Sequence, residues 1–329
     1  WTNHTGFVTE NHLKHYESRA KGGAGIIILE ALCVATEARL TDSQLGIWSD
    51  EHIEGLKQIV DRCHKYGTVV IAQIHHAGLK AANTVSKEIT APSDYVDKST
   101  TARSLTIEEI MNIRNSFVNA AIRAEKAGLD GIELHGAHGY LLSQFASPLI
   151  NHRKDEYGGS LSGRMKLSCG IIRGIKEATS HNFIIGYRMG GNEPELDDGI
   201  KIAQILEGAG VDILHVSVGI AGDKLPSVKK DFPFNWIVYC GTEIKKKVNI
   251  PVIVVNGIRT PEQAEFILDN KLADFVAVGK GILSDPEWPN KAYKKQPINP
   301  CKNCTRCMWF KDGRLCPALL SGYAMHDAL

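Results

Sequence analysis

One pattern repeats along most of the chain: a short apolar run is followed by a longer stretch of helical periodicity. This alternation indicates βα units that build a parallel sheet. The apolar runs are nearly continuous rather than alternating, as in strands that are buried on both faces. We predict strands over residues 26–29, 69–74, 131–134, 184–187, 213–216, 252–255 and 275–278.

Helix boundaries between these strands are marked by residues that satisfy free backbone groups. Thr106 and Glu109 form a capping box ahead of an apolar helical pattern. Thr260 offers a second N-cap, with a proline directly after it and Gln263 three residues later. Three glycines stand where helices are expected to end before the next strand: Gly67, Gly128 and Gly210.

The fold class follows from the number of these units. A closed (β/α)₈ TIM barrel needs eight of them, and seven are visible. Because the chain opens on a loop leading into a helix, we expect a barrel that lacks its first strand in this chain; an open sheet is the alternative. No Gly-x-Gly-x-x-Gly follows a strand, which disfavours a Rossmann fold. We predict a barrel domain over residues 1–295 and a cysteine-rich segment over residues 296–329.

Charge and hydropathy narrow the class of partner. The chain has 38 Lys and Arg residues against 37 Asp and Glu residues, for a net charge of +1. This balance predicts neither nucleic acid nor a membrane surface as partner. No apolar run reaches the roughly 18 residues of a membrane span, and the polar start does not resemble a signal peptide. We therefore predict a cytoplasmic protein acting on a small molecule, with a homo-oligomer left open.

The most informative stretch is Gly131-Ile-Glu-Leu-His135-Gly-Ala-His138-Gly-Tyr140, at the end of a predicted strand. Barrel enzymes place catalytic groups at this end of their strands. A helical turn here would bring His135 and His138 to one side, where two imidazoles could stabilise an oxyanion. Tyr140 is a candidate general acid. The structural alternative is that the histidines cap the strand end and the tyrosine packs in the core.

Neighbouring motifs place this stretch in a family. It continues through Ser147-Pro-Leu-Ile-Asn151 to Gly158-Gly159-Ser160, and an earlier strand ends in Gln73-Ile-His75-His76-Ala-Gly78. Together these motifs resemble the Old Yellow Enzyme family of flavin ene-reductases, over residues 9–288. The resemblance implies an eight-stranded barrel with FMN over its C-terminal mouth. It also implies NADH or NADPH as reductant and an activated alkene as substrate, such as an enone, an enoate or an enoyl compound.

The resemblance assigns roles to individual residues. His135 and His138 would hold the carbonyl or nitro group of the substrate. Tyr140 would protonate the alkene after hydride transfer from flavin N5 to its β-carbon. Gln73 would hydrogen-bond the polar edge of the isoalloxazine, and Arg188 would place positive charge beside its N1 and O2 atoms. For Arg188, an internal salt bridge is the alternative.

The last two βα loops are expected to bind the phosphate of the cofactor, a recurrent arrangement in barrels. Asn256 and Gly257 follow one predicted strand, and Gly279 and Lys280 follow the next. Relatives usually carry Gly-Arg where this chain has Gly279-Lys280. A lysine neutralises a phosphate but cannot hold it in bidentate fashion, so we expect weaker FMN binding.

Four cysteines gather near the C-terminus: Cys301, Cys304, Cys307 and Cys316. Their spacing is typical of iron–sulfur ligation. They fall where the 2,4-dienoyl-CoA reductase and trimethylamine dehydrogenase branch of the family carries a [4Fe–4S] cluster, although that branch spaces its cysteines C-x2-C-x3-C. A Cys₄ zinc site and a site without metal are alternatives. That branch passes electrons from an FAD domain, absent from this chain, so a cluster here would need a separate electron donor protein.

Two rival functions remain open. An amine dehydrogenase-like flavoprotein of the trimethylamine dehydrogenase branch is disfavoured because an amine does not need the oxyanion site of His135 and His138. A non-redox lyase or isomerase with a phosphate-binding barrel would use the two phosphate loops. Such an enzyme would have no need of Gln73 and Arg188 at their strand ends.

Overall fold

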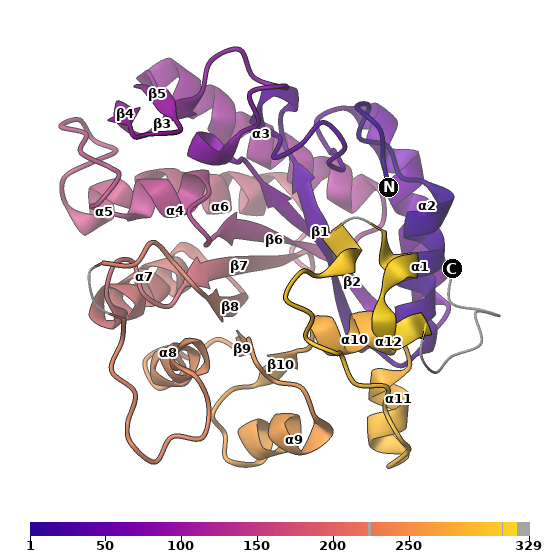
Figure 1. The fold of residues 1–329 in the computed structure, drawn as a ribbon. Helices are drawn as coiled ribbons and strands as arrows, with labels where there is room; N and C mark the ends of the chain where they lie inside the picture. Colours follow the sequence, from indigo (N-terminus) through magenta and orange to yellow (C-terminus); the bar gives the residue numbers. More distant parts are fainter. Residues whose placement is uncertain (223–224, 311, 321–329) are drawn as a thin grey trace.

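Seven parallel strands form the central sheet in a computed structural model, which describes residues 1–222, 225–310 and 312–320. They are hydrogen-bonded in the order β1-β2-β6-β7-β8-β9-β10. Figure 1 shows the strands curling through the centre of the molecule, with helices on the outside. The strands are β1 (Ile26–Cys33), β2 (Val69–His75), β6 (Gly131–Gly136), β7 (Ile184–Gly190), β8 (Ile213–Ser217), β9 (Val252–Val255) and β10 (Phe275–Ala277).

All seven predicted strands are confirmed, and several extend further toward their carboxyl ends than predicted. β6 continues past the apolar run through His135, which lies opposite Arg188 in the register with β7. β2 likewise continues to His75. The prediction stopped where the apolar residues stopped, whereas ladder pairing depends on the backbone and continues through polar residues. Several polar residues therefore lie within the last residues of strands, where neighbouring strands hold them in register.

The helices that flank the sheet begin and end at the predicted caps. The Thr106 and Thr260 side chains accept from the backbone N–H groups of Glu109 and Gln263. Gly67, Gly128 and Gly210 have positive φ, as helix-ending glycines do. The main helices are α1 (Glu10–Lys21), α2 (Ile53–His64), α3 (Ile107–Lys126), α4 (Leu141–Ala146), α5 (Leu161–Arg164), α6 (Lys166–Ala178), α7 (Leu196–Ala209), α8 (Trp236–Lys245) and α9 (Pro261–Asp269).

The strands β1 and β10 stand at the two ends of the strand order. Within the part of the chain that the structure describes, the only strand that pairs with β1 is β2, apart from an isolated bridge from Cys33 to Gly46, and the only strand that pairs with β10 is β9. A parallel sheet of seven strands with helices outside it agrees with the predicted barrel lacking one strand. The sequence predicted no membrane span. Among the helices that the structure describes, none is long and apolar enough to cross a bilayer.

A second, small sheet was not predicted. It consists of β3 (Thr90–Ala91), β4 (Tyr95–Val96) and β5 (Thr101–Ser104), in the order β3-β5-β4. Strands this short leave no apolar run in the sequence, so the region between β2 and α3 resembled a loop. The sheet has its own small core of Ile89, Ala91 and Ala102, which gives this region a defined structure.

The C-terminal segment returns to the first helix of the chain. After α10 (Lys280–Ser284) and α11 (Trp288–Tyr293), it passes through the short turn Met308–Phe310 and ends in α12 (Pro317–Leu320). The Arg19 guanidinium on α1 lies 5.6 Å from the ring centre of Trp309, and Figure 1 shows the segment beside α1. The predicted division at residue 295 stays a prediction, and residues 321–329 of that segment lie outside the described residues.

Candidate active site

The three predicted catalytic residues meet where β6 ends. The ring of Tyr140 lies 4.7 Å from that of His135 and 6.4 Å from that of His138, centre to centre. His135 Nε2 and His138 Nδ1 are hydrogen-bonded at 3.2 Å. No helical turn brings them together, because β6 runs through His135 to Gly136. The histidines converge instead through a tight turn in which His138 and Gly139 have φ values of 58° and 68°.

Burial keeps both imidazoles neutral. It lowers the pKa of His135 well below its ordinary value, and the neighbouring His138 lowers it further. For His138, burial and the positive charge of Arg188 lower the pKa to about 4. Burial raises the pKa of Tyr140, and Arg188 opposes that shift only in part. At neutral pH each imidazole can donate one N–H, and the tyrosine keeps the proton that a general acid must give.

Ser217, at the end of β8, is a site residue that the sequence reasoning missed. Its hydroxyl is hydrogen-bonded to His138 Nε2 at 2.7 Å and accepts from Arg188 Nη2 at 3.4 Å. A hydroxyl that accepts from Arg188 can still donate its own proton to His138 Nε2. In that arrangement the proton of His138 sits on Nδ1, which faces His135. The only sequence signal for Ser217 is that it is a polar residue directly after an apolar strand.

A buried polar network spans three strands next to this cluster. Gln73 Nε2 donates to one oxygen of Glu133 at 2.6 Å, and His215 Nδ1 donates to the other at 2.8 Å. Burial opposes the charge of Glu133, but the attraction and hydrogen bond of His215, together with Arg188 and Gln73, outweigh it and lower the pKa of Glu133. Glu133 and His215 were missed, although each interrupts an otherwise apolar strand.

Arg188 lies in register with His135 on one neighbouring strand and with His215 on the other. Within the described residues its guanidinium forms no ion pair closer than 4.0 Å, although its charge attracts that of Glu133. Its Nε atom and His215 Nε2 are both buried without a hydrogen-bond partner among the described residues. Buried polar atoms are normally satisfied, so these two atoms are suited to a polar ligand.

The predicted phosphate loops border a common cavity of about 520 Å³, lined by Asn256, Gly257, Gly279 and Lys280. Asn256 and Gly257 form a left-handed turn, with φ values of 94° and 74°. The Asn235 amide, which caps α8, donates to the carbonyl oxygen of Asn256 at 3.0 Å and holds this turn in place. An added Cβ at Gly279 would meet no atom within 4 Å, so the space above this loop is open. The open cradle and the unpartnered atoms of Arg188 and His215 fit FMN.

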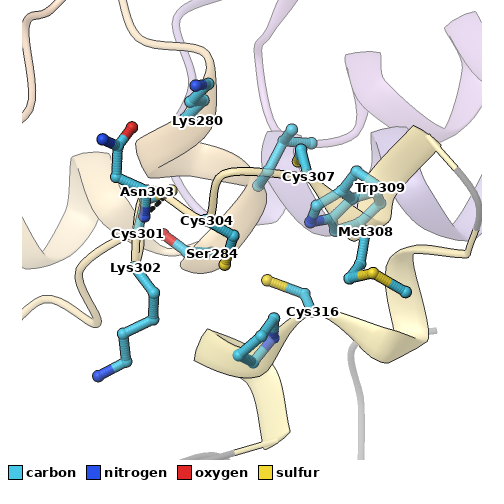
Figure 2. Close-up of a pocket in the computed structure, with 12 residues that line it drawn as sticks. Lys280, Ser284, Cys301, Lys302, Asn303, Cys304, Cys307, Met308, Trp309 and Cys316 are labelled. Carbon is cyan, nitrogen blue, oxygen red and sulfur yellow. Dashed lines mark hydrogen bonds between the residues drawn. The ribbon is translucent and has the colours of Figure 1, made fainter.

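The four C-terminal cysteines line one small cavity of about 20 Å³. Figure 2 shows them around this space, with Lys280 and Ser284 nearby. All four are free thiols, as far as the described residues show. The same part of the chain contains no group of three or more His, Cys, Asp or Glu residues placed to hold a metal ion. The sequence cluster is thus also a spatial cluster, but its sulfurs are not arranged as a ligand set.

His75, next to the catalytic cluster, allows a test of whether burial keeps an imidazole neutral at this site. Its side chain is 0% exposed, and its ring lies 5.1 Å from that of Tyr140. Burial lowers the pKa of His75 to about 3, whereas an unfolded histidine binds a proton near pH 6.5. Acidification through pH 6.5 therefore favours the unfolded wild type. The stability advantage of wild type over His75→Gln should shrink by about 2 kcal/mol between pH 7.5 and pH 5.

Urea unfolding of both proteins at the two pH values measures this difference. His181 has an exposed side chain and provides a matched histidine-to-glutamine control. His181→Gln should follow the pH dependence of the wild type. A constant difference between wild type and His75→Gln would contradict the inference that the imidazole is held neutral.

Two phosphate-type loops, a buried arginine and a tyrosine beside two neutral imidazoles thus lie on one parallel barrel. Residues 2–299 match the model of the NADH:flavin oxidoreductase / NADH oxidase family. The chain belongs to this family, which confirms the resemblance to Old Yellow Enzymes and the predicted fold.

Two relatives show how much of a whole protein the chain represents. It is 43% identical over 317 residues to an NADH oxidase from Thermoanaerobacter brockii, covering 93% of this chain and 48% of that protein. It is 39% identical to an NADPH dehydrogenase from Halalkalibacterium halodurans, covering 87% of this chain and 84% of that protein. The chain thus spans about half the length of the first relative.

Solved structures agree with this assignment. An old yellow enzyme homologue from Zymomonas mobilis superposes with a TM-score of 0.77 at 26% identity, over 91% of this chain and 87% of the other. A 2-naphthoyl-CoA reductase superposes with a TM-score of 0.84 at 23% identity, over 93% of this chain and 50% of the other. At that identity the second match supports the fold alone.

Proposed function

We propose that the protein is an FMN-dependent ene-reductase that uses NADH or NADPH to reduce an alkene activated by a carbonyl or similar group. The observation that supports this most is the cluster of His135, His138 and Tyr140 at one strand end. Two neutral donors and a protonated phenol suit an enolate, which needs its oxygen stabilised and its α-carbon protonated. An amine would need neither group, so an amine dehydrogenase is again disfavoured.

Each residue of the proposed site has a distinct role in alkene reduction. His135 and His138 would donate hydrogen bonds to the substrate oxygen and stabilise the negative charge that develops on it. Tyr140 would deliver a proton to the α-carbon. Ser217 would hold His138 in the tautomer whose Nδ1–H faces His135. The 3.2 Å hydrogen bond between the two rings would give way when the substrate oxygen binds, so that both imidazoles can donate to it.

The cofactor-binding residues are proposals of the same kind. FMN, when bound, supplies the hydride for the β-carbon. Gln73 and Arg188 would bind the polar edge of its ring system, with Glu133 orienting Gln73 through the 2.6 Å hydrogen bond. Asn256, Gly257, Gly279 and Lys280 would hold its phosphate. The positive charge of Arg188 would favour the anionic reduced form and so promote hydride acceptance from NAD(P)H.

An anaerobic visible spectrum tests the proposal. The purified protein, supplied with FMN, should show a bound flavin whose colour is bleached by NADH or NADPH and restored by cyclohexenone. A colourless protein that takes up no FMN would contradict the cofactor assignment. A bound flavin that no enone reoxidises would contradict the reaction. Metal analysis on the same sample examines the cysteines.

For those cysteines we propose a metal site formed by Cys301, Cys304, Cys307 and Cys316, with a [4Fe–4S] cluster preferred to zinc. The C-x2-C-x2-C spacing and the shared cavity support this proposed metal site. Since their present arrangement cannot hold a metal ion, binding would have to draw the thiols together. Iron with broad visible absorbance would support the cluster, zinc without iron the alternative, and neither metal would contradict both. A separate electron donor protein, self-association and a cytoplasmic location stay predictions.

A further inference from the structure

A cavity of about 640 Å³ opens beside His138. Residues from five regions line it: the turn after β2, the small sheet, the turn after β6, α4 with the segment that follows it, and the loop after β8. Apolar side chains from three of these regions, Leu79, Ile150 and Ile220, form part of the wall. Because His138 belongs both to this cavity and to the proposed anchoring pair, a substrate held by His138 has room to extend into it.

Lys80 brings positive charge to this cavity. It is the one ammonium or guanidinium side chain among the described lining residues. Its Nζ donates to the carbonyl oxygen of His138 at 2.6 Å and lies 5.4 Å from the centre of the Tyr140 ring. An ammonium has three N–H donors, and this bond uses one. Lys80 is therefore held beside the anchoring and proton-donating residues with donors to spare.

The acidic group of the cavity, Asp97, is not paired with Lys80 among the described residues. Asp97 accepts hydrogen bonds from the backbone and hydroxyl of Ser99, the backbone of Thr100 and the hydroxyl of Tyr95. These bonds, those from Ser99 first, lower the pKa of Asp97 to about 2. No ion pair joins Asp97 to Lys80 in the described residues. The ionised carboxylate is hydrogen-bonded within its own turn and faces the same cavity as Lys80, whose remaining N–H donors stay free.

The backbone that carries Lys80 is fixed to the catalytic region. The Gln144 amide on α4 donates to the Ala77 carbonyl and accepts from the Leu79 backbone N–H, each at 3.3 Å. Gly78 has a φ of 58°, and an added Cβ there would lie within 2.4 Å of Gln144 Oε1. The turn is thus packed tightly against α4, so the lysine approaches the site from a defined direction.

We propose that Lys80 forms an anion-binding subsite for the substrate, and that preferred alkenes carry a carboxylate or similar acidic group separate from the activating carbonyl. This inference rests on the proposed function and adds a substrate class to it. The carboxylate would accept charge-assisted hydrogen bonds from the free N–H donors of Lys80. The apolar wall would cover the carbon chain between the acid and the alkene.

A matched substrate pair tests the subsite: 6-oxohept-4-enoate and its methyl ester. The acid in this compound is not conjugated with the enone, so the two members are activated equally. Holoenzyme is reduced anaerobically with dithionite, and reoxidation of its flavin is followed at increasing concentrations of each compound. The variants are Lys80→Met, Lys80→Arg and, as a control, Lys87→Met. Lys87 is an exposed lysine of the same segment that does not line the cavity.

For the acid, Lys80→Met should lower the second-order rate constant of flavin reoxidation by about 10- to 100-fold, mainly through a higher apparent Kd, since a charge-assisted hydrogen bond is lost. For the ester, the substitution should change this rate constant by less than about threefold. Lys80→Arg should keep most of the preference for the acid, and Lys87→Met should behave as wild type. Equal losses for acid and ester would overturn the proposal, because Lys80 would then act through His138 or Tyr140. An unchanged acid preference in Lys80→Met would overturn it as well.

Two further measurements separate the possible failures. Reduction of the oxidised flavin by NADH and by NADPH shows whether the anion is a nucleotide phosphate. A Lys80→Met defect confined to NADPH would overturn the assignment to the substrate. Binding of saturated 6-oxoheptanoate and its ester to oxidised holoenzyme, followed by the flavin spectrum, needs no turnover. A Lys80-dependent preference for the acid would support the subsite even if enone reduction failed, and its absence would contradict the subsite alone.

Discussion

Replacing Tyr140 with phenylalanine should slow reoxidation of the reduced flavin by an enone by about 10²–10⁴-fold, the usual contribution of a positioned general acid. The reason is local: burial raises the pKa of Tyr140, so its phenol holds a proton at neutral pH. Its ring touches both histidines, and phenylalanine preserves this packing. Flavin reduction by NADH or NADPH needs no proton from Tyr140 and should change by less than about threefold.

Stopped-flow absorbance resolves the two half-reactions. Tyr66→Phe is a matched control that removes a hydroxyl from an exposed tyrosine, and it should leave both rates at wild-type values. If Tyr140→Phe slowed both half-reactions equally, a change in flavin binding would explain the loss better than a missing proton. If enone reoxidation were unchanged with FMN still bound, Tyr140 would not be the proton donor.

Removing the imidazole pair should have the second-largest effect. The double variant His135→Ala/His138→Ala should slow enone reoxidation by about 10²–10³-fold, the cost of losing preorganised donors to an oxyanion. The single substitutions should be non-additive because the rings are hydrogen-bonded to each other at 3.2 Å. Each alanine removes one donor and also leaves the remaining ring without its partner.

Two observations separate this effect from a change in charge. Burial lowers the pKa of His138 to about 4, so the neutral pair should give a flat rate between pH 6 and pH 8. His138→Asn retains an N–H donor and should recover part of the rate lost in His138→Ala. If the double variant bound flavin and an enone reoxidised it at the wild-type rate, the pair would not stabilise the substrate oxygen.

The secondary structure was largely readable from the sequence because its signals are local. Continuous apolar runs located every strand of the main sheet, and the caps at Thr106 and Thr260 located helix starts. The order of the βα units was also sufficient to predict roughly which residues lie close together in the site. Carboxyl ends of parallel strands lie at one face of a barrel, so Gln73, His135 and Arg188 were expected near one another.

The detailed site depended on contacts between distant residues, which no local pattern encodes. Glu133 joins Gln73 and His215 from two other strands, and this arrangement exists only once the strand register is set. The spacing of His135 and His138 would bring the rings together through a helical turn, whereas in the structure the ladder of β6 holds the first ring and a left-handed turn places the second.

The motifs in the sequence were thus sufficient to predict the barrel fold and to select His135, His138 and Tyr140 as candidate catalytic residues. Only the tertiary structure decided their protonation, because burial and the neighbouring Arg188 set it. Tertiary structure also placed Lys80 beside them, since its position follows from packing of the turn at Gly78 against α4. For the cysteines the sequence supplied the spacing, and the packing of the C-terminal segment brought them to one cavity without forming a ligand set.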